Sequence, residues 1–222
     1  MRYAISVQYI GKNYAGSQIQ FENGKQIALP TIQGELEKAL STLIKNNRCN
    51  TDGYGADLNN NRPVRAIFSG RTDKGVNARG QVVHFDTEEL IVASKFLYSI
   101  NEILPDDISV SDLREVDKSF HAQKSAKKRH YRFEFINRRC KNAFDGDLMR
   151  IKYEINIERM QKSLNYLLGE HDFSSFKSSG TLNPSKICNL YEANVSKVGD
   201  KVIIDIIGNR FLYNMVRTIV GT

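Results

Sequence analysis

The sequence predicts an α+β fold made of two similarly ordered halves, at residues 1–117 and 118–222. Two patterns carry this prediction. Short stretches alternate apolar and polar residues, as half-buried strands do, and longer stretches place apolar residues at every third or fourth position, as helices do. With 222 residues, the chain is long enough for one large domain or two small ones with their own cores. We expect the halves to form a mostly antiparallel sheet with helices on one face.

The first half is expected to contain a strand, a helix, two strands, a helix and a closing strand. Alternation at 2–10 predicts the first strand. Apolar residues at helical spacing predict a helix over 31–43, with Thr31 as its N-cap after Pro30. The stretch at 45–63 is rich in Asn, Asp and Gly, which is typical of a long surface loop. The remaining elements are two short strands, a helix and a strand, at 64–70, 80–86, 94–104 and 108–116.

The second half repeats this order up to its last helix. The strand at 130–136 alternates Tyr131, Phe133 and Phe135 on one face, and we expect both phenylalanines in the core. The helix at 157–170 has Gly169 as its expected C-cap. A hairpin and a final helix follow, at 190–198, 201–208 and 210–222.

This order corresponds to a split βαβ plan, ferredoxin-like or RNP-like, used twice. The second copy lacks the closing strand of the first. Because a domain seldom ends within an apolar helix, we expect the chain to be a shortened piece of a longer protein.

The composition favours some partners and disfavours several kinds of site. A formal charge of +7 favours polyanionic partners, although a mild excess of cations can also serve solubility alone. No apolar run approaches the length of a membrane span, and the N-terminus lacks the apolar core of a signal peptide, so we expect a soluble, cytoplasmic protein. The three cysteines form no C-x-x-C pair, the histidines show no metal-ligand spacing, and no phosphate-binding loop is present.

One segment, "SGRTDKGVNARGQVVHFD" at 69–86, places a single carboxylate among cations. Asp73 lies between Arg71 and Lys74, which are expected to stabilise its charged form. An ionised carboxylate suits a nucleophile or an electrostatic stabiliser better than a general acid. Cleavage of a glycosidic bond, with positive charge developing on the sugar, is chemistry of this kind. The alternative is that "TDKG" is simply a turn.

A second segment, "SFHAQKSAKKRHYRFEF" at 119–135, crowds cations around the start of an aromatic strand. Cations that hold phosphates and rings that stack on bases suit a nucleic acid. The alternative is a strand whose aromatic face is core and whose lysines protect a sheet edge. Tyr131, at the start of the strand, fits either role.

Together these segments carry a family resemblance. The segment at 69–86 closely resembles the G-R-T-D-A-G-V-H-A-x-G-Q-V-x-H-F signature of the tRNA pseudouridine synthase A family. Further stretches resemble the family in the same order: "TIQGELEKAL", "LPDDISV", "FHAQKSAKKRHYRF", "GEHDFSSF" and "RFLYNMVRTIVG". The resemblance covers nearly the whole chain.

The resemblance implies roles for particular residues. Asp73 corresponds to the essential catalytic aspartate of the family. Arg71 corresponds to an arginine associated with the flipped nucleotide, Tyr131 to the tyrosine that stacks on the target base, and Arg217 to the basic residue that pairs with the catalytic carboxylate. The residues expected to contact RNA by their charge are Lys74, Arg79, Lys127, Lys128 and Arg129.

The resemblance also implies the reaction and the partners. Family members isomerise uridine to pseudouridine in the anticodon stem-loop of tRNA, commonly at positions 38–40, in an active cleft between the two halves. They use no metal or organic cofactor and generally act as homodimers. Two other readings stay open: an RNA-binding module with the same fold and no chemistry, and a glycosidase acting on a free nucleoside.

Overall fold

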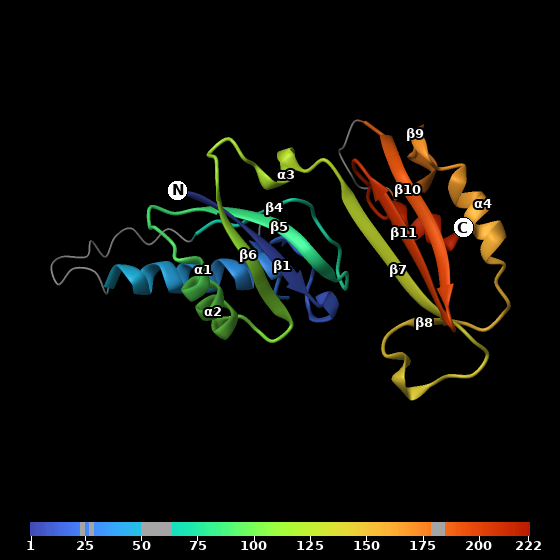
Figure 1. Ribbon diagram of the computed structural model, residues 1–222, viewed down its shortest axis with the longest axis horizontal. Coiled ribbons are helices and arrows are strands. Elements are labelled where there is room, and N and C mark those ends of the chain that lie inside the picture. The colour runs from blue at the N-terminus through green and yellow to red at the C-terminus, as the bar shows by residue number, and fades with distance from the viewer. Residues whose placement is uncertain (23–24, 27–28, 50–63, 179–184) are drawn as a thin grey trace. The chain divides into compact units, whose positions relative to one another are not determined.

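The chain divides into two compact units. In the computed structural model, the described residues are 1–22, 25–26, 29–49, 64–178 and 185–222. Unit 1 comprises Met1–Ser125 and unit 2 comprises Ala126–Thr222 (Figure 1). The division into functional halves at 1–117 and 118–222, with the catalytic motif in the first, stays a prediction.

Unit 1 contains a four-stranded antiparallel sheet with the strand order β4-β5-β1-β6. Its strands are β1 (Arg2–Tyr9), β4 (Ile67–Phe68), β5 (Ala78–Asp86) and β6 (Ile108–Val116), and its helices are α1 (Ile32–Cys49), α2 (Ala93–Ile103) and α3 (Ala122–Ser125). A short hairpin, β2 (Phe21–Glu22) with β3 (Lys25–Gln26), and the 3₁₀ turn η1 (Gly11–Asn13) complete the unit.

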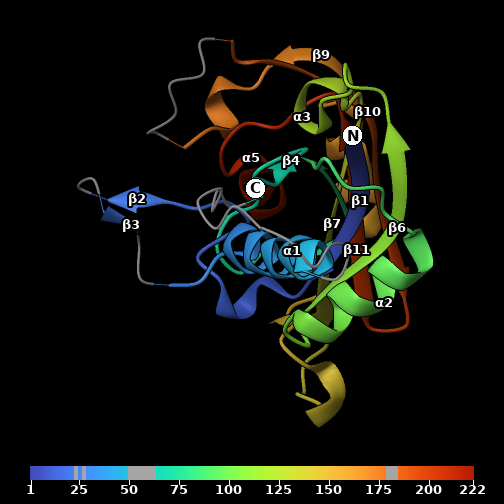
Figure 2. The ribbon, with the colours of Figure 1, turned by 90° about the vertical axis from the view of Figure 1, so that its left-hand side faces the viewer.

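The core of unit 1 lies on one face of its sheet. Every second residue of β1 is buried, namely Tyr3, Ile5, Val7 and Tyr9. These side chains form one cluster with the buried faces of α1 and α2, so both helices cover the same face of the sheet (Figure 2). Leu36 of α1 is fully buried, and burying a leucine contributes about 1.5–3 kcal/mol.

Unit 2 contains a five-stranded mixed sheet with the order β8-β7-β11-β10-β9, in which only the β7–β8 pair is parallel among the described strands. Its strands are β7 (Arg129–Asn137), β8 (Met149–Ile151), β9 (Gly169–Asp172), β10 (Ile187–Val198) and β11 (Lys201–Gly208). Its helices are α4 (Ile157–Asn165) and α5 (Met215–Gly221), with 3₁₀ turns η2 (Ala143–Asp145) and η3 (Ser174–Phe176).

The core of unit 2 joins alternate residues of β11 to both helices. Val202, Ile204 and Ile206 are buried, and they cluster with Leu164 of α4 and Met215 of α5. Phe135 is part of this cluster and Phe133 packs against it, which confirms their predicted place in the core.

The predicted α+β class is confirmed: the described residues contain five α-helices with antiparallel and mixed sheets. The predicted N-cap is also confirmed, because the Thr31 hydroxyl accepts a hydrogen bond from the Gly34 N–H at 3.1 Å. The hairpin turns at Gly199–Asp200 as expected, with Gly199 at a φ of +59°. Within the part of the chain described, no helix is long and apolar enough to cross a membrane.

Three predicted boundaries are wrong. Helix α1 continues to Cys49, into the expected loop, because glycine and proline are absent from 45–49; the rest of that loop, 50–63, lies outside the described residues. Helix α4 ends at Asn165, and Gly169 is no C-cap: with a φ of +93° it opens β9. Helix α5 begins only at Met215, because the preceding Asn214 is left-handed, with a φ of +60°.

Candidate active site

Asp73 lies in a tight turn between β4 and β5. The Val76 N–H donates to the Asp73 carbonyl oxygen at 3.1 Å, which closes the turn. Gly75 has a φ of +79°, a conformation that glycine adopts without strain. The turn therefore spans Asp73–Val76, one residue further along the chain than the expected "TDKG" at 72–75.

A buried hydrogen-bond network fixes the residue next to Asp73. The Thr72 N–H donates to Ser17 Oγ at 2.8 Å, and the Ser17 N–H donates to the Thr72 carbonyl oxygen at 3.1 Å. The hydroxyls of Tyr9 and Thr72 are hydrogen-bonded at 2.8 Å. Thr72 is only 9% exposed, Tyr9 3% and Ser17 not at all, so these bonds have no competition from water.

The backbone of Gly16 packs directly against this network. A Cβ atom at Gly16 would lie 2.8 Å from the Thr72 carbonyl oxygen, and its φ of +137° is strained for other residues. Sequence reasoning missed the supporting role of Tyr9, Gly16 and Ser17. No local pattern in the sequence around these residues indicated the contact.

The downstream end of the turn is anchored as well. The Gly11 N–H donates to Asn77 Oδ1 at 2.8 Å, and a Cβ at Gly11 would lie 2.2 Å from the Val76 carbonyl oxygen. The turn is thus held at both ends by the segments that follow β1. This rigidity is what a catalytic group requires to keep its orientation.

The Asp73 side chain is half-buried, whereas Arg71 and Lys74 are exposed. The expected stabilisation of the Asp73 carboxylate by these two cations stays a prediction.

The remaining predicted residues of unit 1 extend this surface. Arg79, the second residue of β5, is exposed close to the turn. Unit 1 thus brings Asp73, Arg71, Lys74 and Arg79 onto one turn and the start of the strand that follows it.

In unit 2, Tyr131 lies on β7 and is half-buried. Its ring packs edge-to-face against Phe211, with ring centroids 4.9 Å apart. Such packing restricts the orientation of the Tyr131 ring. Sequence reasoning also missed Phe211, because it is far from Tyr131 along the chain.

Arg217 projects from the exposed side of α5, whose opposite side buries Met215 and Ile219. Its position relative to Tyr131 and to Asp73 stays a prediction.

The basic residues before β7 differ in how they are held. Lys127 and Lys128 are exposed, and the Lys128 ammonium lies 5.2 Å from the centre of the Tyr191 ring, a cation–π contact. Arg129 donates from Nη1 to the Asn209 carbonyl oxygen at 2.6 Å. Arg129 therefore already braces the backbone, and its predicted contact with RNA would have to use its other N–H groups.

The described residues contain no group of three or more His, Cys, Asp or Glu side chains placed to hold a metal ion. Cys140 is exposed and Cys188 is buried, and both are free thiols.

Comparison with known proteins identifies the family. A profile described as tRNA pseudouridine synthase matches residues 163–222. The tRNA pseudouridine synthase A of Anoxybacillus flavithermus is 40% identical over 223 aligned positions, which cover 100% of this chain and 81% of the relative. The proteins of the same name from Brevibacillus brevis (38% identical; 96% of this chain, 79% of the relative) and Buchnera aphidicola (37%; 100% and 76%) are similar in extent. The chain therefore belongs to the tRNA pseudouridine synthase A family.

Proposed function

We propose that this protein is a tRNA pseudouridine synthase that isomerises uridine in the anticodon stem-loop. Similarity along nearly the whole of this chain, and over 81% of the relatives, to enzymes named for this reaction carries the proposal. The rigid, glycine-bounded turn that presents Asp73 supports it, because the reaction needs a fixed carboxylate beside the sugar.

The reaction rearranges bonds without adding or removing atoms. The bond between uracil N1 and ribose C1′ breaks, the uracil rotates, and a bond forms between C5 and C1′. The proton on C5 is lost to the surroundings and N1 takes up a proton. No oxidant or reductant is needed, and the difficult step is the positive charge that develops on the sugar when the glycosidic bond weakens.

In this proposal Asp73 acts on that sugar, either by attacking it or by accepting a proton from it. A uridine within a folded RNA has to be extruded before its glycosidic bond is accessible. Tyr131 stacks on the extruded base, Arg71 holds its phosphate, and Arg217 pairs with Asp73 once substrate is bound.

The finer features of the fold and assembly are also part of the proposal. We propose that the two units are a repeated split βαβ plan, that the active cleft lies between them, and that the enzyme acts as a cytoplasmic homodimer. The supports are the parallel order of elements in the sequence and the family resemblance. Light scattering after size-exclusion chromatography tests the dimer: a mass close to the 25.3 kDa of one chain at micromolar concentration would contradict it.

The function is tested by incubating the protein with unmodified tRNA and mapping pseudouridine by carbodiimide treatment and primer extension. We expect new stops within the anticodon arm for the wild type and none for Asp73→Asn. Binding of tRNA without any stop for the wild type would support the RNA-binding module instead. Release of free uracil from uridine would support the nucleoside glycosidase.

A further inference from the structure

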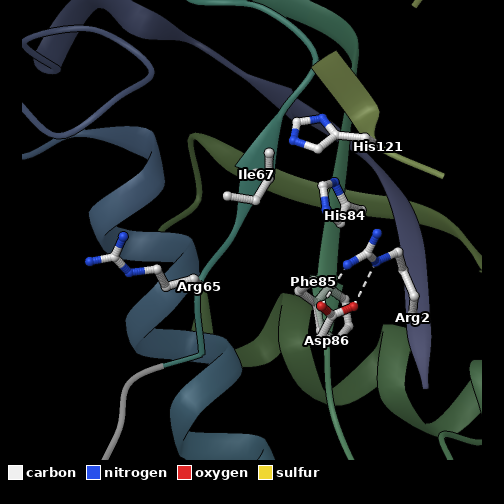
Figure 3. A pocket seen from close by; sticks show the side chains of 7 residues that line it. All are labelled: Arg2, Arg65, Ile67, His84, Phe85, Asp86 and His121. Atoms are coloured by element: carbon white, nitrogen blue, oxygen red, sulfur yellow. Dashed lines mark hydrogen bonds and ion pairs between the residues drawn. The ribbon is translucent and has the colours of Figure 1, made fainter. Parts of the chain in front are cut away.

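Unit 1 contains a cavity whose lining includes no residue of the Asp73 turn (Figure 3). It has a volume of about 320 Å³ and lies over β5 and the edge strand β4. Its polar lining consists of Arg2, Arg65, His84, Asp86 and His121. None of these residues has a role in the reaction proposed above.

The cavity lies on the face of the sheet that α1 and α2 leave uncovered. His84 is in register with Ala4 and Ile67, and Arg2 with Asp86. Because residues of a strand alternate between faces, these positions lie opposite the face of Tyr3 and the helices. The cavity therefore lies on the face of the sheet opposite α1 and α2, where α3 packs against β4 and β5.

His84 supplies a buried hydrogen-bond donor at the floor of this cavity. The residue is 3% exposed, and its Nδ1 accepts a hydrogen bond from the Ala122 N–H at 3.2 Å. In the neutral ring the proton then resides on Nε2. Among the described residues, every fully enclosed side-chain nitrogen or oxygen has a hydrogen-bond partner. His84 Nε2 has no partner in the part of the chain that the structure describes, so it is not fully enclosed. Because His84 lines the cavity, we place this N–H at the cavity surface.

Burial lowers the pKa of His84, and the neighbouring Arg2 and His121 lower it further. The ring is therefore a neutral donor near pH 7. His121 lies next to it, with ring centroids 5.0 Å apart. Its Nδ1 accepts from the Lys124 N–H at 3.4 Å, which leaves Nε2 as a second donor.

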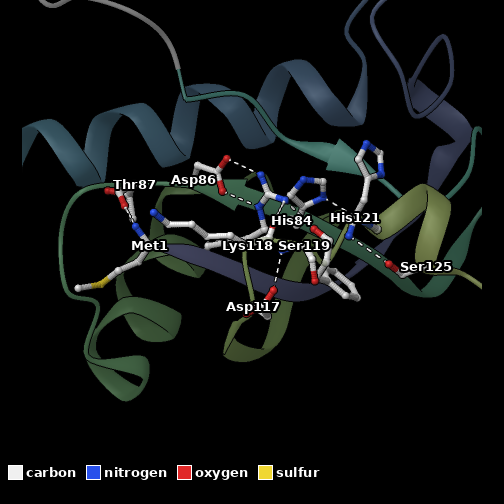
Figure 4. A network of polar contacts seen from close by, with 12 residues as sticks. Met1, His84, Asp86, Thr87, Asp117, Lys118, Ser119, His121 and Ser125 are labelled. Atoms are coloured by element: carbon white, nitrogen blue, oxygen red, sulfur yellow. Dashed lines mark hydrogen bonds and ion pairs between the residues drawn. The ribbon is translucent and has the colours of Figure 1, made fainter.

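The carboxylate in the lining is compensated. Asp86 accepts two hydrogen bonds from Arg2, from Nε at 2.7 Å and from Nη2 at 2.8 Å. Arg2 Nη1 donates to the carbonyl oxygens of Lys118 and Phe120, at 2.6 and 2.7 Å (Figure 4). The fixed pair contributes no net charge to the cavity.

The remaining fixed charge of the lining is positive. Arg65 is exposed and has no ion-pair partner among the described residues. Its long side chain can turn toward the cavity. Two imidazole N–H donors and an unpaired guanidinium around one hollow form a donor set for an oxyanion.

We propose that this cavity binds a phosphate group of the tRNA backbone. The volume accommodates a phosphate with part of its nucleotide, and RNA supplies such groups at regular intervals to a chain of formal charge +7. This inference rests on the proposed function for its choice of RNA as partner.

The position of the cavity gives this contact a defined purpose. Strand β5 begins at Ala78, just after the Asp73 turn, and His84 lies six positions further along it. At about 3.3 Å per residue, the two positions are about 20 Å apart. A phosphate bound there belongs to a nucleotide several positions away from the target uridine. The cavity thus contributes to the choice and placement of the tRNA and has no part in the chemical step.

The test compares Arg65→Gln with a matched control, Arg114→Gln. Arg114 is also exposed, on β6 at the opposite edge of the same sheet, where it pairs with Asp112 at 2.8 Å. The affinity for unmodified tRNA is measured at several salt concentrations, and folding of each variant is checked by thermal denaturation. We expect Arg65→Gln to weaken binding about fivefold and to reduce the slope of log K against log salt by about 0.7–0.9. Arg114→Gln is expected to leave both unchanged.

Steady-state kinetics on the same variants separates this inference from the proposed function. Arg65→Gln is expected to raise KM for tRNA about fivefold with kcat retained. If the wild type binds tRNA and forms no pseudouridine, the proposed function fails while the binding comparison still decides the cavity. If Arg65→Gln and Arg114→Gln have the same affinity and salt slope, the cavity proposal is overturned.

Inorganic phosphate provides the last arm of the test. Its titration is followed by NMR through the imidazole resonances of His84 and His121. Perturbation by phosphate that Arg65→Gln weakens supports an oxyanion site. The same perturbation without any effect of Arg65→Gln on tRNA affinity means that the site takes a free phosphate compound, which contradicts the RNA contact proposed here.

Discussion

The hydroxyl pair between Tyr9 and Thr72 is expected to position the catalytic turn, and this can be tested by removing each hydroxyl. Thr72→Val keeps the shape of the side chain and deletes the group that Tyr9 contacts at 2.8 Å. Because Tyr9 is 3% exposed, water cannot take the place of the lost hydrogen bond. The net contribution of one such hydrogen bond to stability is about 0.5–1.5 kcal/mol. For a chain of this size each kcal/mol lowers Tm by about 2–4 °C.

A double-mutant cycle separates the pair from the rest of the network. Tyr9→Phe and Thr72→Val are each expected to destabilise the protein, and the double variant to cost little more than either alone. The coupling free energy is expected to be about 1 kcal/mol. Additive effects of the two substitutions would show that the bond contributes no stability of its own.

Activity distinguishes positioning from stability. Tyr3→Phe is the matched control, because Tyr3 is a buried tyrosine on the same face of β1 whose hydroxyl accepts from the Ile91 N–H at 3.1 Å, away from the turn. We expect Thr72→Val to lower kcat about tenfold at temperatures where the protein is folded, since small misplacements of a catalytic group are costly. Tyr3→Phe should lower Tm and leave kcat unchanged. If both variants retain full kcat, the network does not position Asp73.

Two further predictions concern the same unit. In a denaturation experiment, Gly16→Ala should lower the free energy of unfolding by about 1–3 kcal/mol or more, because a residue other than glycine is strained at a φ of +137° and its Cβ meets the Thr72 carbonyl oxygen. Gly75→Ala is also strained but has open space around its Cβ, so it should lower the free energy of unfolding by less. Folding lowers the pKa of His84 below its ordinary value of 6.5. Between these two pKa values, the imidazole is protonated more often in the unfolded chain than in the folded protein. Stability should therefore be fully present above about pH 6.5 and decrease as the pH falls toward the folded-state pKa. His84→Gln should flatten this part of the stability–pH curve relative to His121→Gln, and an unchanged curve would contradict the assignment.

The sequence was most informative where the signal is local. The alternation of β1 and β11 predicts which of their residues are buried, because a strand's two faces differ along a few consecutive positions. The turn at Asp73 was also predictable from its own residues. Helix α5 was placed too early because nothing in the apolar run 210–222 signals that Asn214 adopts a left-handed conformation.

The support of the site was not predictable in this way. Tyr9 and Thr72 are 63 positions apart, and Ser17 and Thr72 are 55 apart, so their hydrogen bonds arise only when the sheet has formed. The cavity around His84 was not predictable either. The sequence indicated that His84 lies in a strand, which the structure confirms. The N–H that His84 directs to the cavity, however, depends on the hydrogen bond that Nδ1 accepts from the Ala122 N–H, 38 positions away. Contacts of this kind follow from tertiary structure, and local patterns do not contain them.

The central claim is that Asp73 performs the chemistry on tRNA. The most direct measurement is single-turnover release of tritium from tRNA labelled at uracil C5, since forming the C5–C1′ bond expels that hydrogen. With the wild type and with Asp73→Asn at saturating enzyme, we expect release by the wild type and none detectable by the variant, while their affinities for tRNA agree within about threefold. Tritium release by Asp73→Asn at the wild-type rate would contradict the account.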